Sequence, residues 1–391
     1  MRLSTLVRPV FHPVCSALVL GLALAMPAAA LDTSARAALV VDHATGTVLL
    51  SKNAELPLPP ASMSKLMTLN MLFEALKDGR LELSDTFRVS TKAWQMGGSK
   101  MFLREGNEVS VEDLIHGIIV QSGNDACVVV AEGLAGSEEA FALRMTQRAR
   151  ELGMMDSVFA NSTGWPHPDH RMTAEDLVTL ATRLINEFPQ YYPFFAETSF
   201  TWDGIEQQNR NPLLGLNVGA DGLKTGHTEE AGYGLVGSAM QEGRRVTFMV
   251  TGLDSARERL VESERLINWA FREFASREVY APGTTIAEAD VWVGARATVP
   301  LVSDGGVMAV IPWTQADNLT ARVEYDGPLK APIAAGDVVA ELVLSVPEIG
   351  ETRYPLQAGA AVAEGGFVKK LEASARILGA QAIDMAFGDS N

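Results

Sequence analysis

The 391-residue chain has little cysteine, which limits how its fold can be held together. Its two cysteines are Cys15 and Cys127, and Cys15 lies in an N-terminal segment that we expect to be removed. One thiol then remains, so no internal disulfide can form. Cys127 lies in the apolar run Ala126 to Ala131, which predicts a buried packing residue. Stability must come from hydrophobic cores, and 47% hydrophobic residues suffice for roughly two or three domains.

Histidine and positive charge are also scarce. Two of the six histidines occur in His167-Pro168-Asp169-His170, which has neither the helical spacing nor the His-Glu-x-x-His pattern of a metal site. We therefore expect no metal and no cofactor. Lys and Arg number 32 against 48 Asp and Glu, a net charge of −16. Such a charge argues against nucleic acid as a partner.

The N-terminus carries the pattern of an export signal. Arg2 and Arg8 provide a basic start, Val14 to Ala25 is apolar, and Ala28-Ala29-Ala30 offers small residues for cleavage. The apolar stretch is short for a membrane anchor, and no stop-transfer charges follow it. We expect residues 1–30 to be a signal peptide of an exported, periplasmic protein.

Residues 31–277 combine strand and helix patterns. The expected elements are a hairpin over 36–51, helices over 62–76, 110–119, 125–136, 138–152 and 174–188, strands over 222–226, 233–239 and 246–253, and a final amphipathic helix that includes Leu266 and Phe274. A tight loop interrupts the helices at Ser122-Gly123-Asn124, and a loop-rich region spans 161–171. The three late strands, separated by short turns, predict an antiparallel meander.

The composition changes after Ala281-Pro282-Gly283. Short alternating apolar segments such as Val307 to Ile311, separated by Gly, Pro and Asp turns, predict a small all-β domain over 278–364 without a catalytic motif. The last stretch, Gly366 to Phe387, has apolar residues at helical spacing. Two interpretations of a helix over 365–391 stay open. It would either lie on a membrane surface or dock on the β domain.

Three short motifs carry the chemistry: Ser62-Met63-Ser64-Lys65, Ser122-Gly123-Asn124 and Lys224-Thr225-Gly226. Together they supply a nucleophilic hydroxyl, two amines and an anion clamp on a strand, which suffices for serine acyl transfer without a catalytic histidine. Ser62 and Lys65 lie on one face at a helix start, where exposed amides favour a developing anion. Lysine is a base only when neutral, so Lys65 must be desolvated or crowded by another cation, for which Lys224 is a candidate.

Each motif alone has an ordinary structural explanation. Ser62 and Lys65 could be a helix cap and a solvated lysine, the second motif a turn, and the third an exposed strand edge. However, Lys65 is the only charged residue between Ala61 and Asn70, and a lone lysine in an apolar helix is unusual. The occurrence of all three motifs, in this order and in three structural contexts, favours the functional interpretation.

On these residues the chain resembles the low-molecular-mass penicillin-binding proteins, the serine-type D-alanyl-D-alanine carboxypeptidases of peptidase family S11. The resemblance runs from about Leu31 to the C-terminus and includes three longer strings, at 60–65, 121–126 and 221–228. It implies an α/β (α+β) fold. A β-lactamase/transpeptidase-like catalytic domain with an antiparallel sheet and a helical lobe would be followed by a small all-β sandwich domain and a C-terminal amphipathic helix.

The resemblance also implies roles for the motif residues. Ser62 would be the nucleophile and Lys65 its base. Ser122 would relay a proton to the departing D-alanine, and Asn124 would hold both the substrate backbone and Lys65. The amides of Ser62 and His227 would form the oxyanion hole.

Substrate binding is implied for a second set of residues. Lys224 and Thr225, in the strand that continues through Gly226, would bind the terminal carboxylate. Arg210 matches a family arginine near the site, and Arg259 matches one that binds the carboxylate. Arg259 begins a charged helix, so a solvated role is equally open. The loop over 161–171 departs from many relatives because it carries Thr163-Gly164-Trp165. The substrate preference of those relatives therefore does not carry over directly.

The implied activity is removal of the terminal D-alanine from peptidoglycan stem peptides ending in D-Ala-D-Ala, through an acyl-enzyme at Ser62 that β-lactams would also form. The enzyme would be periplasmic, with attachment to the outer face of the inner membrane through 366–387. One alternative is a class A-like β-lactamase, which deacylates with a glutamate-activated water, but the loop over 161–171 has no glutamate. The other is a non-catalytic wall-binding scaffold, against which the intact motif set argues.

Overall fold

A computed structural model describes residues 31–315, 318–347 and 349–366. The predicted signal peptide lies outside these residues, as does the predicted C-terminal helix beyond Gly366. Among the residues described, no helix combines the length and the hydrophobicity that a membrane span requires.

One five-stranded sheet organises the N-terminal part. Its strands are β1 Ala37–Asp42, β2 Val48–Lys52, β7 Ala220–Thr228, β8 Gly232–Gln241 and β9 Arg244–Leu253, in the order β2-β1-β9-β8-β7. All neighbours are antiparallel, with Val40 opposite Phe248 and Lys224 opposite Val236. The predicted hairpin thus joins the predicted meander in one sheet, as the family resemblance implied. Strand β7, which carries the third motif, is at the edge.

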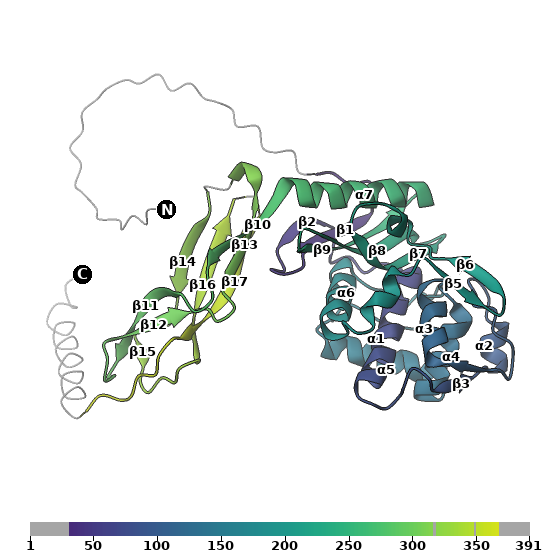
Figure 1. The fold of residues 1–391 in the computed structure, drawn as a ribbon, viewed down its shortest axis with the longest axis horizontal. Coiled ribbons are helices and arrows are strands. Elements are labelled where there is room, and N and C mark those ends of the chain that lie inside the picture. Colours follow the sequence, from purple (N-terminus) through teal and green to yellow (C-terminus); the bar gives the residue numbers. More distant parts are fainter. Residues whose placement is uncertain (1–30, 316–317, 348, 367–391) are drawn as a thin grey trace, which may run out of the picture. The chain divides into compact units, whose positions relative to one another are not determined.

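Helices cover both faces of this sheet. The helical lobe contains α1 Lys65–Lys77, α2 Thr91–Gln95, α3 Val111–Ile119, α4 Asn124–Ala135, α5 Glu138–Glu151 and α6 Ala174–Glu187. Figure 1 shows this lobe on one side of the sheet and α7, Ala256–Glu273, on the other. The predicted starts of the helices over 110–119 and 174–188 agree with the structure. Both helices are capped there, because the Ser110 and Thr173 side chains accept hydrogen bonds from the amides of Asp113 and Asp176.

Two helix boundaries differ from the sequence prediction. The helix expected from Ser62 begins with a 3-10 turn, η1 Ala61–Ser64, and becomes regular at Lys65. The chain enters from Pro60 through Ala61 at φ +48°, which requires a tighter first turn. Phe274, expected on the last helix, instead opens strand β10, because its backbone is already extended there.

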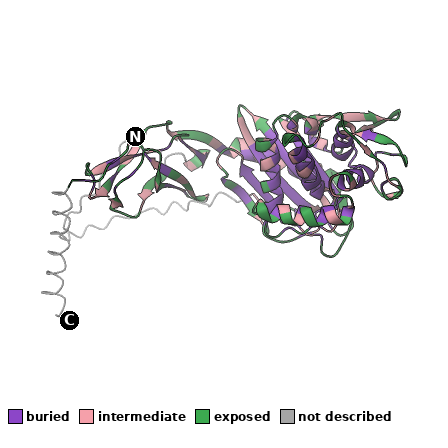
Figure 2. Ribbon diagram, turned by 90° about the horizontal axis from the view of Figure 1, so that it is seen from below, coloured by how far each residue is buried: buried purple, intermediate pink, exposed green. Residues whose placement is uncertain are grey.

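The N-terminal part has one large apolar core between the lobe and the sheet. Buried residues are concentrated in the central strands and helices (Figure 2). Leu66, Leu69 and Phe73 of α1 belong to the same cluster as Val236 and Met249 of the sheet. Cys127 is buried in this cluster, which confirms the prediction of a packing cysteine.

Shorter elements connect the helices and shape the region around the second motif. They are β3 Thr86–Arg88 paired with β4 Glu108–Ser110, β5 Ser199–Trp202 paired with β6 Ile205–Gln208, and the 3-10 turns η2 Tyr192–Ala196 and η3 Pro212–Gly215. The β5–β6 hairpin is tied to residues 96–104 because Gln207 Nε2 donates to the Lys100 carbonyl, 3.2 Å away.

The C-terminal part is all-β, as predicted. Its strands are β10 Phe274–Tyr280, β11 Thr285–Trp292, β12 Thr298–Val302, β13 Val307–Pro312, β14 Thr320–Glu324, β15 Leu329–Lys330, β16 Val338–Val346 and β17 Gly350–Ala358, with the turn η4 Trp313–Gln315. Strand β10 pairs with β13, and the other six form a sheet in the order β14-β16-β17-β12-β11-β15. They enclose a separate apolar core that includes Leu301, Leu342 and Leu356.

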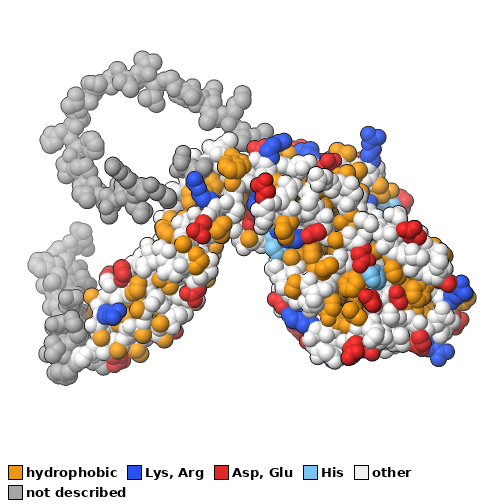
Figure 3. Space-filling model, viewed as in Figure 1, with side chains coloured by type: hydrophobic (Ala, Val, Ile, Leu, Met, Phe, Trp, Pro, Cys, Tyr) orange, Lys and Arg blue, Asp and Glu red, His pale blue; other side chains and the backbone are white. Residues whose placement is uncertain are grey.

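The negative net charge is dispersed over the visible surface. Figure 3 shows acidic and basic side chains interspersed on the face that it presents, without a large patch of one sign. The cations that do cluster belong to the site described next, where Lys65, Lys224 and Arg259 are buried and Arg210 is exposed.

Candidate active site

The first and third motifs meet because strand β7 packs tightly against the turn that carries Ser62. A Cβ atom placed on Gly226 would lie 3.0 Å from the Pro60 carbonyl oxygen and 3.2 Å from the Ala61 Cβ atom. A larger residue at this position would push the strand and the turn apart. Glycine in the third motif therefore allows the strand to lie beside the serine.

Lys65 occupies the centre of the site. Its side chain is fully buried, and its Nζ atom lies 2.8 Å from Ser62 Oγ, 2.8 Å from Asn124 Oδ1 and 2.5 Å from the carbonyl oxygen of Thr163. The first turn of the helix provides the reach to Ser62, while α4 and the loop over 161–165 provide the other two oxygens. The structure thus brings the first and second motifs into direct contact.

Burial sets the protonation of Lys65. Loss of water around the ammonium group lowers the pKa of Lys65 to about 8, and the positive charge of Arg210 acts in the same direction. The sequence predicted desolvation or a second cation, with Lys224 as the candidate. Desolvation is the larger cause, and Arg210 is one cation that depresses this pKa. Lys224 also interacts repulsively with Lys65, as the lowered pKa of Lys224 shows.

The second motif is held in an unusual backbone conformation. Ser122 has φ +56°, in the left-handed region, and its hydroxyl is buried without a hydrogen-bond partner among the described residues. The amide of Gly123 donates to the Gly117 carbonyl at 2.9 Å, and that of Asn124 donates to the Ser99 carbonyl at 2.7 Å. These bonds hold the backbone of the loop in place, and the unpartnered Ser122 hydroxyl can bind another group.

Asn124 connects Lys65 to the loop over 96–104. Its Oδ1 atom accepts from Lys65, and its Nδ2 atom donates to the Gly97 carbonyl at 2.8 Å. Next to it, the Asp125 carboxylate accepts from the amides of Met101 and Leu103, at 2.9 and 3.0 Å. The sequence analysis assigned no role to Asp125, although it lies in the string over 121–126 that carried the resemblance.

The third motif contributes a second buried lysine. Lys224 is 1% exposed, and its Nζ atom donates to the Thr225 carbonyl at 3.2 Å. Burial, followed by the charge of Lys65, lowers the pKa of Lys224 well below its usual value. Thr225 is also buried, whereas His227 is exposed and stacks on Tyr233, with ring centroids 3.9 Å apart.

Both candidate arginines lie near these groups. Arg210 donates from Nη1 to Ser99 Oγ at 2.5 Å, and its carbonyl oxygen is 3.5 Å from Arg259 Nη2. Arg259 is 8% exposed, and its guanidinium lies over the Tyr233 ring, 5.7 Å from the centroid. The solvated alternative for Arg259 is therefore wrong. Four cations surround a site in a protein of negative net charge, and such a cluster favours an anionic ligand.

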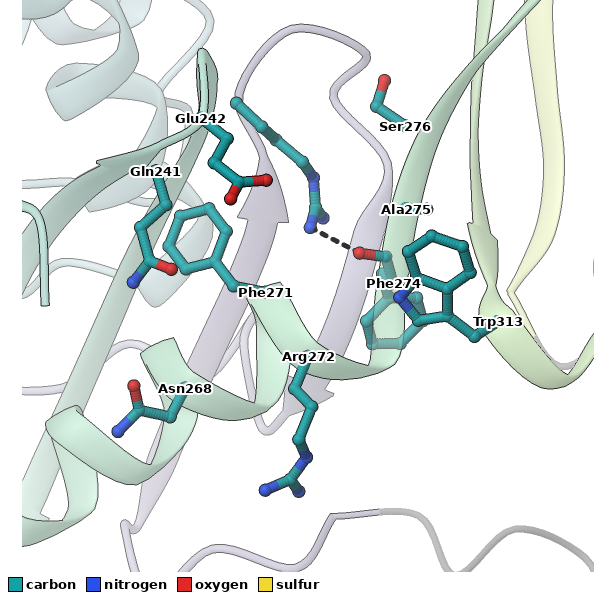
Figure 4. A pocket seen from close by; sticks show the side chains of 10 residues that line it. Gln241, Glu242, Asn268, Phe271, Arg272, Phe274, Ala275, Ser276 and Trp313 are labelled. Carbon is teal, nitrogen blue, oxygen red and sulfur yellow. Dashed lines mark hydrogen bonds between the residues drawn. The ribbon is translucent and has the colours of Figure 1, made fainter.

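A separate pocket of about 760 Å³ contains none of the motif residues. Figure 4 shows Gln241 and Asn268 on one side of it and Trp313 on the other. Arg244 also lines this pocket, but its guanidinium is engaged by Asp42 at 2.8 Å and by the Phe274 carbonyl at 2.9 Å. The contacts of the three motifs, rather than this pocket, therefore define the candidate active site.

Comparison with known proteins agrees with this geometry. Residues 24–255 match the family model described as D-alanyl-D-alanine carboxypeptidase, and residues 274–364 match the one described as penicillin-binding protein 5, C-terminal domain. The D-alanyl-D-alanine carboxypeptidase DacC of Escherichia coli K12 is 38% identical over 344 residues, which cover 86% of each chain.

Solved structures give the same result. The crystal structure of penicillin-binding protein 5 from Haemophilus influenzae matches with a TM-score of 0.79 and 32% identity, over 85% of this chain and 99% of that one. Penicillin-binding protein D2 from Listeria monocytogenes in its ampicillin-bound form matches with a TM-score of 0.57 and 31% identity, over 62% and 98%. The resemblance inferred from three motifs is confirmed: the chain belongs to peptidase family S11 and is a serine-type D-alanyl-D-alanine carboxypeptidase.

Proposed function

We propose that Ser62 is the nucleophile of the carboxypeptidase reaction and that Lys65 is its general base. The observation that carries this proposal is the 2.8 Å contact between Lys65 Nζ and Ser62 Oγ in a buried environment. With a pKa of about 8, about a tenth of the lysine is neutral at pH 7. Neutral Lys65 takes the hydroxyl proton while Ser62 Oγ attacks the carbonyl carbon of the penultimate D-alanine.

The tetrahedral intermediate then needs stabilisation and a proton for its leaving group. The amides of Ser62 and His227 donate to the oxyanion, one from the 3-10 turn and one from strand β7. Ser122 passes a proton from Lys65 to the nitrogen of the departing D-alanine, a role supported by its buried, unpartnered hydroxyl. Loss of D-alanine leaves an ester on Ser62, which water hydrolyses to regenerate the serine.

Binding of the terminal carboxylate is assigned to the cations on the other side of the site. Lys224, Thr225, Arg210 and Arg259 supply the charge and the hydrogen-bond donors. Strand β7 is at the sheet edge, so the substrate backbone can add to it as a further strand, next to Gly226. His227 lies near the end of this edge strand, where its exposed ring stacks on Tyr233.

β-Lactams and peptidoglycan stem peptides are the partners that this site fits. A β-lactam presents a strained amide and a carboxylate in the place of D-Ala-D-Ala, so it acylates Ser62 by the same route. The ampicillin-bound form of the Listeria relative supports this assignment. No glutamate side chain comes from the loop over 161–171, so no observation favours the β-lactamase alternative.

The test is covalent labelling followed by turnover. After exposure to a fluorescent penicillin, intact-mass analysis of the full chain should show one adduct. Digestion should locate this adduct on the peptide containing Ser62, and Ser62→Ala should show no adduct. The wild-type protein should release D-alanine from a peptide ending in D-Ala-D-Ala. Equal labelling of Ser62→Ala and wild type would exclude Ser62 as the nucleophile.

We further propose a cellular location and a domain division. Export to the periplasm through 1–30 and contact with the inner membrane through 366–387 rest on the sequence pattern, and catalytic and β domains over 31–277 and 278–364 are consistent with the matched ranges. Cell fractionation should place the full chain with membranes and a chain lacking 366–387 in the soluble periplasmic fraction. Identical fractionation of the two would exclude the membrane contact.

A further inference from the structure

The loop that supplies the Thr163 carbonyl is stiff in itself. The Asn161 Oδ1 atom accepts from the amides of Thr163, Gly164 and Trp165, at 3.1, 2.8 and 3.0 Å, and from the Thr163 hydroxyl at 3.0 Å. These bonds fix the shape of the loop over 161–165. They do not fix where the loop sits relative to the helix that carries Lys65.

Position is set by the contacts of Ser162. Its carbonyl accepts from Thr68 Oγ1 of α1 at 2.7 Å. Its amide and hydroxyl both donate to Glu138 Oε1, at 3.1 and 2.7 Å. Glu138 is the first residue of α5 and is 8% exposed. One carboxylate oxygen thus holds the residue directly before Thr163 by its main chain and by its side chain.

The second oxygen of Glu138 is also engaged. Oε2 lies 3.0 Å from Nζ of Lys92, on α2, which compensates the buried charge. Both carboxylate oxygens of Glu138 are thus occupied by donors of the protein, so Glu138 is poorly placed to activate a water molecule. Glu138 is therefore not an equivalent of the water-activating glutamate of class A β-lactamases.

We propose that Glu138 is a positioning residue, which anchors Ser162 so that the adjacent Thr163 carbonyl stays in contact with Lys65. The loop also packs closely on the turn that carries the nucleophile, because a Cβ atom on Gly164 would lie 1.8 Å from the Ala61 carbonyl oxygen. A shift of the loop would therefore alter both the base and the turn of the nucleophile. This inference rests on the proposed role of Lys65 as the base.

The chain offers a matched control for Glu138. Its neighbour Glu139 pairs with the same Lys92 at 2.7 Å, but its side chain is 76% exposed and it makes no contact with the loop. Glu138→Ala removes the acceptor and should slow acylation of Ser62 by a fluorescent penicillin about 10-fold or more. Glu138→Gln keeps an oxygen that can accept from Ser162 and should lose much less, and Glu139→Gln should acylate at the wild-type rate. Melting temperatures of all variants report whether the fold persists.

Ser162→Ala separates positioning from charge, because it removes one anchor without changing any charge. It should also slow acylation. In the double variant the two effects should be less than additive, because Ser162→Ala and Glu138→Ala break the same contact. It should also move the midpoint of the pH dependence of acylation downward, because the ammonium form of Lys65 loses an acceptor. The charged or titratable groups that act on Lys65 are Asp125, Cys127, Glu138, His170, Arg210 and Lys224, and Ser162→Ala replaces none of them.

The outcomes are distinguishable. Wild-type rates and pH midpoints in both Ser162→Ala and Glu138→Ala would overturn the inference. A loss in Glu138→Gln as large as that in Glu138→Ala, with a wild-type rate in Ser162→Ala, would also overturn it, because Glu138 would then act only through its charge. If Glu138→Ala fails to fold, Ser162→Ala decides, with Glu138→Gln as the variant that keeps the acceptor. Persistent labelling of Ser62→Ala would instead refute the proposed function.

Discussion

Charged side chains are used in opposite ways in the two parts of the molecule. In the catalytic part, Lys65 and Lys224 are almost completely buried, and their pKa values are lowered. In the β domain, two arginines and three glutamates form a ladder across β14, β16 and β17, with side chains between 42% and 51% exposed. They are Arg322, Glu324, Glu341, Glu351 and Arg353.

The difference shows what burial does to a charge. Exposed pairs are screened by water, keep their ordinary ionisation and contribute little to stability. A buried lysine gives up its proton more readily and retains a strong interaction with any anion that enters. Charged side chains therefore form a solvated surface network in one part and a buried cationic site in the other.

The largest effect is expected where burial and reactivity coincide. Lys65→Arg keeps a positive charge but cannot supply a neutral base, because guanidinium does not deprotonate in proteins. We expect the rate of acylation by a fluorescent penicillin to fall by roughly 10³-fold or more. Stopped-flow labelling measures it, and an acylation rate within tenfold of wild type would show that burial of an amine is not what the site requires.

A smaller loss is expected at the second buried lysine. Lys224→Met keeps the length and apolar stem but removes the charge that would meet the terminal carboxylate. We expect kcat/KM for a D-Ala-D-Ala peptide to fall about 100-fold. A matched peptide amide, which lacks the carboxylate, should be affected much less. Equal losses for acid and amide substrates would contradict carboxylate binding by Lys224.

These two lysines also show how far the sequence could predict the site. Motif spacing placed Lys65 beside Ser62, and the apolar neighbours of Lys65 indicated its burial. The Thr163 carbonyl was missed because a backbone oxygen has no side-chain signature. The contact between Glu138 and Ser162 was missed because 24 residues separate the two, and neither belongs to a motif.

The fold was predicted best where local signals exist. The Ser110 cap, followed by Asp113 three residues later, marked a helix start, and alternating apolar residues marked the sheet strands. The burial of Arg259 could not be read from the charged helix that contains it, because its position is decided by packing against Tyr233 and the Arg210 segment.

The pH dependence gives an intermediate effect. A lysine is a base only when deprotonated, so the proposed role of Lys65 predicts that acylation increases as pH rises through about 8 and levels off above it. Between pH 7 and pH 9 the increase should be about tenfold. Second-order rate constants for penicillin labelling across this range test the sign. A rate that falls with rising pH would show that the protonated amine is the required form.

The smallest effect is expected in the exposed ladder. Arg353→Gln breaks contacts with Glu324 and Glu341, 2.7 and 2.8 Å away, but both glutamates remain solvated. We expect an unchanged melting temperature and a carboxypeptidase activity within about twofold of wild type. A large loss of activity would mean that the ladder communicates with the catalytic part, which would break the comparison.

The lone thiol of α4 offers a way to watch the catalytic core open. Burial raises the pKa of Cys127 to about 12, so in the native protein it is both hidden and unreactive. After removal of 1–30 no other sulfhydryl would compete for reagent. The rate of alkylation at this single position would therefore measure how often the helices around Lys65 open to solvent, and no engineered probe is needed.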